Sequence, residues 1–171
     1  SRKHHLQVSR SGLVTITGGK WTTYRKMAED TVDKAAMVAG LDRKKCRTED
    51  LPIHGSVDDV DDNDPLRYYG SDADDMRSLV SGHPEMGKRL HKRLPFTSVE
   101  VLWSVRHEMA RTVEDILARR QRALFLDASA AMEMAPGVAG ILAAELGRDE
   151  DWQRRQVERF TELALGYFPA D

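Results

Sequence analysis

GLVTITGGKWTTYR, residues Gly12–Arg25, sets the architecture of the N-terminal part of this chain. The run Leu13–Thr17 is rich in β-branched residues, which predicts a strand. Gly18–Gly19 ends that strand. The apolar residues that follow recur at helical spacing, and they predict a helix from about Thr22 to Ala39 that Gly40 terminates. A strand is therefore expected to run through paired glycines directly into a helix.

The residues on either side of this stretch suggest how the chain is divided. Leu6–Val8 is a second strand-like run, and the turn-prone Ser9–Gly12 between the two strands predicts a hairpin. After residue 40 the apolar residues become sparse, and five of the seven residues in Asp58–Asp64 are aspartates. We therefore expect a hairpin and helix over 1–40, a solvated linker over 41–65, and a separate domain over 66–171.

Residues 66–171 contain helical patterns throughout, so the predicted fold class is mainly α. Thr97 with Glu100 three residues later forms a capping-box pattern at the start of a long predicted helix. The buried stripe of that helix is expected to comprise Leu102, Val105, Met109, Val113, Ile116 and Leu117.

Shorter helices are expected before and after it. One begins at Asp72 or Asp74 and ends at Val80, and another runs from Pro84 to near Leu94. A further helix begins at Asp127 and should be interrupted or restarted by Pro136, because proline lacks an amide donor. The last runs from about Glu150 to Tyr167, and Trp103 and Trp152 are expected in the core.

Composition excludes several classes of protein. Of 171 residues, 40% are hydrophobic and 32% are charged, which is the balance of a globular domain. The net charge of −2 gives no general attraction to nucleic acid. No apolar run approaches the roughly 20 residues of a membrane-spanning helix. The single cysteine, Cys46, favours a reducing compartment such as the cytoplasm.

The Gly-Gly-Lys turn is the strongest candidate site. Free amides at a helix N-terminus attract negative charge, glycines let a ligand approach the backbone, and Lys20 adds a cation at the same point. A tight turn with a solvated lysine explains the same residues about equally well. The turn is not a P-loop, because Val14 and Trp21 occupy positions where that motif has glycine and Ser or Thr.

Two long motifs resemble those of the FAD-dependent glycerol-3-phosphate dehydrogenases. Gly18–Glu29 is similar to the segment that ends the FAD-binding domain of that family, and Val105–Arg120 to the signature of its helical C-terminal domain. Arg122–Ala128 extends the second match. The resemblance implies that residues 1–40 are the C-terminal remnant of an FAD-binding domain and that 66–171 are the helical C-terminal domain.

The resemblance also assigns roles to particular residues. In the family this turn approaches the pyrimidine edge of the flavin, and a lysine and an arginine lie near the phosphate of the substrate. The corresponding residues here are Gly18, Gly19, Trp21 and Thr22 for the cofactor, and Lys20 and Arg2 (of Ser1-Arg2) for glycerol 3-phosphate. No catalytic residue and no metal site is implied.

The expected function follows from the same resemblance. The full-length parent would oxidise sn-glycerol 3-phosphate to dihydroxyacetone phosphate with FAD and pass the electrons to quinone, on the inner face of a membrane. This chain lacks the G-x-G-x-x-G fingerprint, so alone it should be inactive and depend on an N-terminal FAD-binding domain. The alternatives are an α-glycerophosphate oxidase, which uses oxygen, and a helical interaction or dimerisation module, with a homodimer or a peripheral membrane contact left open.

Other motifs are weaker. His107-Glu108 begins a zinc-protease pattern, but Arg111 stands where the second histidine belongs. The basic cluster Lys88–Arg93 either meets anionic lipid or has intramolecular partners, and the second explanation is favoured. The arginines of 106–122 are expected to dock the flavin domain, with Arg106–Glu108 and Arg111–Asp115 as local pairs.

Overall fold

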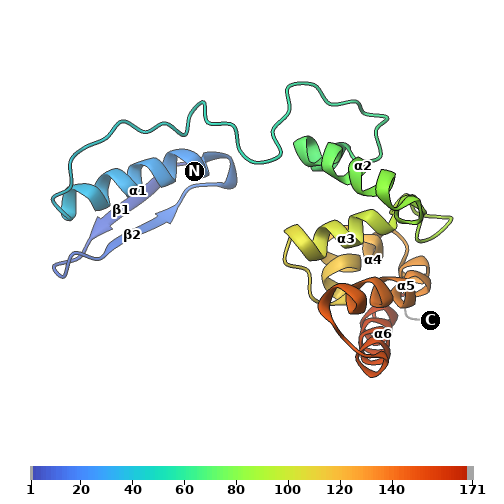
Figure 1. Ribbon diagram of the computed structural model, residues 1–171. Helices are drawn as coiled ribbons and strands as arrows, with labels where there is room; N and C mark the ends of the chain where they lie inside the picture. Colours follow the sequence, from blue (N-terminus) through green and yellow to red (C-terminus); the bar gives the residue numbers. More distant parts are fainter. Residues whose placement is uncertain (1, 169–171) are drawn as a thin grey trace. The chain divides into compact units, whose positions relative to one another are not determined.

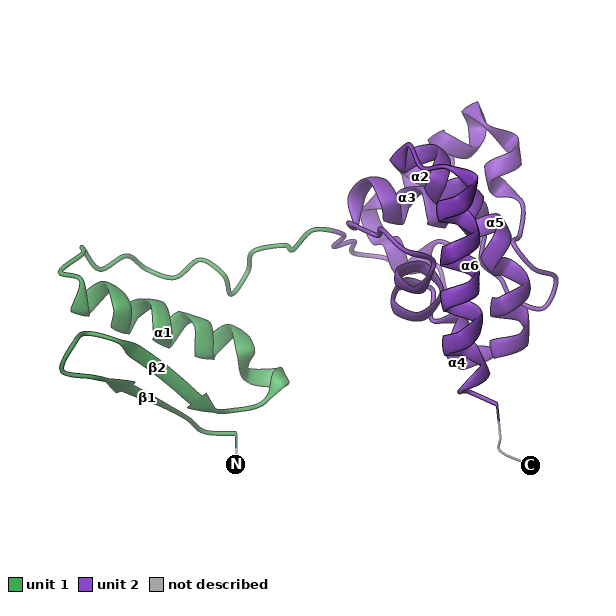
Figure 2. Ribbon diagram, turned by 90° about the horizontal axis from the view of Figure 1, so that it is seen from below, with its two compact units in different colours: residues 1–54 green, residues 55–171 purple. Residues whose placement is uncertain are grey.

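The computed structural model describes residues 2–168, and the chain divides into two compact units between His54 and Gly55 (Figure 2). That division falls inside the acidic, apolar-poor segment 41–65. Each unit is described by itself below.

The first unit is a hairpin with one helix on it (Figure 1). Strands β1 (His4–Val8) and β2 (Val14–Gly18) pair antiparallel with Leu6 opposite Ile16. A short 3-10 turn, η1 (Trp21–Thr23), leads into α1 (Tyr24–Val38). The predicted hairpin and the predicted strand–glycine–helix order are both confirmed.

Helix α1 ends as its glycine predicts. Gly40 has a φ of +65°, and the amide of Leu41 donates to the carbonyl of Ala36 at 2.9 Å. This is the left-handed helix ending that glycine favours because it has no Cβ. None of the described residues of this unit is fully buried, and Val32 on α1 is 65% exposed. The unit therefore leaves apolar helix surface uncovered.

The second unit is mainly α, as predicted. Its elements are η2 (Arg67–Asp72), α2 (Ala73–Gly82), η3 (Pro84–Gly87), α3 (Ser98–His107), the π-helical η4 (Asp115–Arg120), α4 (Ala123–Leu126), α5 (Ala128–Leu146) and α6 (Glu150–Leu165). Helices α5 and α6 pack along each other, with α3, η4 and α4 against α5.

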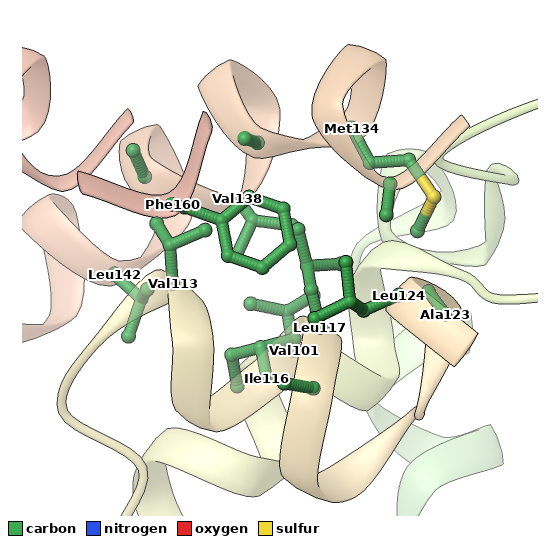
Figure 3. Close-up of a cluster of buried hydrophobic side chains, with 14 of the residues drawn as sticks. Val101, Val113, Ile116, Leu117, Ala123, Leu124, Met134, Val138, Leu142 and Phe160 are labelled. Atoms are coloured by element: carbon green, nitrogen blue, oxygen red, sulfur yellow. The ribbon is translucent and has the colours of Figure 1, made fainter. Parts of the chain in front are cut away.

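The main core of this unit is an aliphatic cluster whose one fully buried aromatic ring is that of Phe160 (Figure 3). Phe160 of α6 is 1% exposed and lies among residues of η4 and α5, including Leu117, Val138 and Leu142. A smaller cluster joins Met76 and Val99 to Trp103, which is buried as predicted. Trp152 is half-buried at the edge of the main cluster.

The prediction of one long helix from Thr97 through Leu117 is wrong. Its capping box is present, since Glu100 accepts hydrogen bonds from the amide and the hydroxyl of Thr97. However, α3 ends at His107, and Met109 has a φ of +56° and is 77% exposed rather than buried. The amide of Ala110 donates to the carbonyl of Ser104 at 3.0 Å, so the chain closes α3 in a left-handed ending with methionine in the position where glycine is usual.

Three further predictions need correction. The segment after Pro84 is one 3-10 turn rather than a helix to Leu94, because the amide of Leu90 pairs with the carbonyl of Phe96 in a tight reversal. Helix α5 continues through Pro136 without a break, since the flanking turns are buried and one lost donor does not outweigh that packing. Helix α6 ends at Leu165, before Tyr167.

Within the described residues, no helix is both long and apolar enough to cross a membrane.

Candidate functional site

The two glycines of the predicted site both have left-handed backbones. Gly18 has a φ of +77° and Gly19 a φ of +75°. A Cβ on Gly19 would lie 2.3 Å from the sulfur of Met27, and one on Gly18 would lie 3.1 Å from the carbonyl oxygen of Lys3. Both glycines are therefore required by the fold of this unit itself, whatever the turn binds.

Lys20 is the residue at which the extended chain becomes helical. Its amide donates to the hydroxyl oxygen of Thr23 at 3.1 Å, and that hydroxyl donates to the carbonyl of Lys20 at 2.9 Å. The amides of Trp21 and Thr22 follow in the first turn, where a helix offers no carbonyl partner. The turn thus places two helix N-terminal amides beside an exposed lysine.

An aromatic surface adjoins these amides. Trp21 is 84% exposed and stacks on Tyr24, with ring centroids 5.2 Å apart and planes inclined by 21°. Large exposed aromatic residues commonly mark a surface that meets another molecule or domain. The turn therefore combines a flat aromatic face, a cation and helix amides.

The predicted substrate residues lie at the same end of the hairpin. The amide of Gly19 donates to the carbonyl of Lys3 at 3.0 Å, and His4 pairs with Gly18 in the strand register. Arg2, which is exposed, therefore belongs to the same end of the unit as Lys20. Ser1, the other member of the predicted Ser-Arg pair, lies outside the described residues.

A side-chain contact joins the helix to the hairpin close to this turn. The imidazole of His4 lies 2.9 Å from the carboxylate of Asp30, and the ammonium of Lys26 lies 2.9 Å from the same carboxylate. Hydrogen bonds from Lys26, and then from His4, hold the pKa of Asp30 below its usual value. The Lys26–Asp30 spacing is visible in sequence as an i,i+4 pair, but the contact to His4, 26 residues away, is not.

In the helical unit, the arginines pair differently from the prediction. Arg106 contacts Glu145 of α5 through two nitrogens at 2.7 and 2.9 Å, not Glu108. Asp115 accepts from the backbone amide of Arg111 at 3.0 Å, and its carboxylate pairs with Arg119 at 2.8 Å. The Arg106–Glu145 pair joins α3 to α5, whereas the contacts of Asp115 are local to the start of η4.

Two arginines close the end of α3. The guanidinium of Arg111 donates to the carbonyls of Val105 and Ala110 at 3.0 and 2.8 Å, and that of Arg120 donates to the carbonyl of Glu108. Because cations stabilise the C-terminal end of a helix, these contacts are explained by the fold. A role in docking the flavin domain stays a prediction.

The basic cluster Lys88–Arg93 has partners within the unit. His91 lies 3.0 Å from Glu133 of α5, and Arg93 lies 3.0 Å from Asp127 at the start of that helix. The rest of the cluster includes Lys92, which is exposed.

Comparison with known proteins gives a consistent result. Residues 13–153 match the family described as the C-terminal domain of alpha-glycerophosphate oxidase. The chain is 36% identical to the probable mitochondrial glycerol-3-phosphate dehydrogenase of Caenorhabditis elegans, covering 97% of this chain and 26% of that protein. It is 35% identical to the mitochondrial glycerol-3-phosphate dehydrogenase of Rattus norvegicus, over 98% of this chain and 26% of that protein. It is 34% identical to a mitochondrial glycerol-3-phosphate dehydrogenase of Arabidopsis thaliana, over 95% and 31% respectively.

The chain thus spans about a quarter to a third of the length of these relatives, while almost all of its own residues are covered. The two motifs around Gly18–Glu29 and Val105–Arg120 both lie inside the matched range. The chain therefore belongs to the family of the C-terminal domain of alpha-glycerophosphate oxidase, together with the corresponding part of the glycerol-3-phosphate dehydrogenases.

Proposed function

We propose that the full-length protein containing this chain oxidises sn-glycerol 3-phosphate to dihydroxyacetone phosphate with FAD and passes the electrons to quinone. The observation that carries the proposal is the coverage of 97% of this chain by a relative named as a glycerol-3-phosphate dehydrogenase. In the proposed enzyme this chain supplies one wall of the active site and the helical domain.

The proposed site residues are those at the end of the hairpin. Lys20 and Arg2 would hold the phosphate of the substrate, because both are exposed cations at one end of the unit. The flavin edge would meet the turn and the first helical amides, at Gly18, Gly19, Trp21 and Thr22. FAD, when bound, supplies the acceptor for the hydride. The residues of this chain contribute positioning and electrostatic stabilisation.

The fit to FAD is partial. The stacked Trp21 and Tyr24 and the adjacent amides suit one edge of a planar, partly anionic group. In contrast, Gly18 and Gly19 are already required by the backbone and by Met27, so they do not by themselves argue for a ligand. The chain has no G-x-G-x-x-G sequence. We therefore propose that firm cofactor binding comes from an N-terminal FAD-binding domain and that this chain alone is inactive.

A second candidate function differs only in the electron acceptor. The matched family is described as part of an oxidase, which favours oxygen, whereas the relatives above are named as dehydrogenases. Oxygen consumption measured against quinone reduction by the full-length enzyme distinguishes the two.

A third candidate function is an interaction or dimerisation module, which is favoured by the exposed apolar side chains of α1.

The cellular location is also a proposal. A cytoplasmic location with contact to the inner face of a membrane stays a prediction, whereas the relatives above are named as mitochondrial. Sedimentation of the full-length protein with anionic vesicles tests the membrane contact.

The role of Lys20 is tested by Lys20→Ala in the full-length enzyme, with Lys45→Ala, another exposed lysine of the same unit, as control. Loss of a charge-assisted contact worth about 1.5–3 kcal/mol should lower kcat/KM by about 10- to 100-fold. FAD content and unfolding temperature should stay unchanged. An unaltered kcat/KM with FAD still bound would reject the role assigned to Lys20.

A further inference from the structure

A cavity of about 840 Å³ opens on the helical unit, and none of its lining residues is used by the proposed function. Its walls come from three separate parts of the chain: residues 65–69, residues 95–108, and the joint between η4 and α4 at residues 120–126. Cavities of this size that combine apolar walls with a few polar groups are typical of small-molecule sites.

The apolar walls are largely aromatic. Tyr68 and Phe125 line the cavity and are 81% and 53% exposed, and Tyr69 and Phe96 line it from partly buried positions. Flat rings of this kind favour the faces and edges of another aromatic group. The walls therefore suit a ligand with a planar body.

Three arginines and two glutamates line the cavity. The carboxylates of Glu100 and Glu108 accept hydrogen bonds from the hydroxyls of Thr97 and Ser104, and the arginines differ in how many hydrogen bonds they make within the chain. Arg67 contacts the hydroxyl of Tyr68 and the carbonyl of Asp64, and Arg120 contacts the carbonyl of Glu108. Arg122 is exposed and lies over the ring of Phe125, 5.5 Å from its centroid. Across the described residues no carboxylate lies within ion-pair distance of Arg122, so its charge is available to an anion.

The backbone at Arg122 is strained. Its φ of +59° and ψ of +23° are left-handed, which costs a residue with a Cβ roughly 1–2 kcal/mol. The strain directly follows a π-helical turn, in which the amide of Gln121 reaches back to the carbonyl of Ile116 at 2.9 Å. Strained residues and π-helical turns both occur often at functional sites.

Gln121 gives an independent indication. It lines the same cavity and is only 6% exposed, and both polar atoms of its side chain are buried without a hydrogen-bond partner in the described structure. An unsatisfied buried amide costs on the order of 1–3 kcal/mol. Burial of such a group at a cavity wall is explained if a ligand, with small side-chain movement, completes its hydrogen bonds.

We propose that this cavity binds a small organic anion with an aromatic body. The anionic group would pair with Arg122, the ring would pack against Phe125 and Tyr68, and Gln121 would hydrogen-bond a polar edge. The cavity shares no residue with the Gly-Gly-Lys turn, and this proposal does not depend on the proposed function.

The proposal is tested with a matched pair of fluorescent probes on the 171-residue chain. The anionic probe is 8-anilino-1-naphthalenesulfonate, and N-phenyl-1-naphthylamine is its neutral counterpart without the sulfonate. Binding is located by backbone amide shifts in NMR spectra. We expect saturable binding of the anionic probe with shifts concentrated at residues 120–126, and at least about tenfold weaker binding of the neutral probe there.

Variants of Arg122 distinguish the contribution of its charge to binding from an effect on folding. Arg122→Asn removes the charge while asparagine tolerates the left-handed backbone, so the protein should stay folded and lose about tenfold in affinity for the anionic probe. Arg122→Lys should retain most of the affinity. Arg154 is an exposed arginine on α6 that does not line the cavity, so Arg154→Asn is the control and should leave the affinity unchanged.

Gln121→Leu gives a further check. It should raise thermal stability, because it removes an unpaired buried amide, and it should weaken binding of the anionic probe. The proposal is overturned if the probe shifts no amide in residues 120–126, if the neutral probe binds there equally well, or if Arg122→Asn binds like the unaltered chain.

Discussion

Met109 offers a direct test of how α3 ends. Its left-handed φ of +56° costs about 1–2 kcal/mol for a residue with a Cβ, and its side chain is 77% exposed, so little packing is at risk. Glycine removes that strain but adds roughly 0.5–1 kcal/mol of chain entropy to the unfolded state. Met109→Gly should therefore raise the free energy of unfolding of the helical unit by up to about 1.5 kcal/mol.

The assay is urea unfolding followed through tryptophan fluorescence, to which the buried Trp103 and the half-buried Trp152 of this unit contribute. Met109→Ala is the control, because alanine keeps the strain and should leave the midpoint nearly unchanged. If residue 109 instead lay inside a continuous helix, as its sequence pattern suggests, glycine would destabilise by about 1 kcal/mol relative to alanine. A lower midpoint for Met109→Gly than for Met109→Ala would refute the left-handed ending.

Two further predictions concern the same unit. Phe160→Ala should destabilise it by about 3–5 kcal/mol, because the ring is 1% exposed at the centre of the core. Thermal unfolding followed by circular dichroism checks this, and a loss below about 1 kcal/mol would contradict the packing described. Burial raises the pKa of Glu100 despite the hydrogen bonds from Thr97. A raised folded-state pKa means that stability is greatest with the carboxyl protonated and declines as pH rises through that pKa. Glu100→Gln should therefore gain stability relative to the unaltered chain as the pH rises above the ordinary range of a glutamate carboxyl, and urea titrations that show a constant difference would exclude this effect.

Sequence patterns predicted the secondary structure correctly where the residues that determine an element lie close together in sequence. The hairpin, the ending of α1 at Gly40 and the capping box of Thr97 and Glu100 all depend on contacts within a few residues. The ending of α3 could not be predicted, because Met109 is neither Gly nor Asn. The ending depends on side chains such as Arg120, whose contact to Glu108 spans 12 residues.

The candidate sites could likewise be predicted only where their residues are adjacent in sequence. The Gly-Gly-Lys turn was recognisable because its glycines, lysine and helix start are contiguous. The pairing of His4 with Asp30 was not, since it requires the helix to be folded onto the hairpin. The cavity at Gln121 and Arg122 was also invisible in the sequence, because its walls come from three segments with no characteristic spacing.

The arginine contacts at the end of α3 also determine how this region opens. Arg111 and Arg120 hold the carbonyls of Val105 and Glu108, so the last turn of α3 cannot fray without releasing the chain that leads into η4. Fraying normally makes helix ends exchange their amide hydrogens fastest. Here the amides from the end of α3 through η4 should exchange as one cooperative unit, with a common free energy of opening. We therefore expect the irregular segment between the two helical elements to open together with the core rather than as an independent loop.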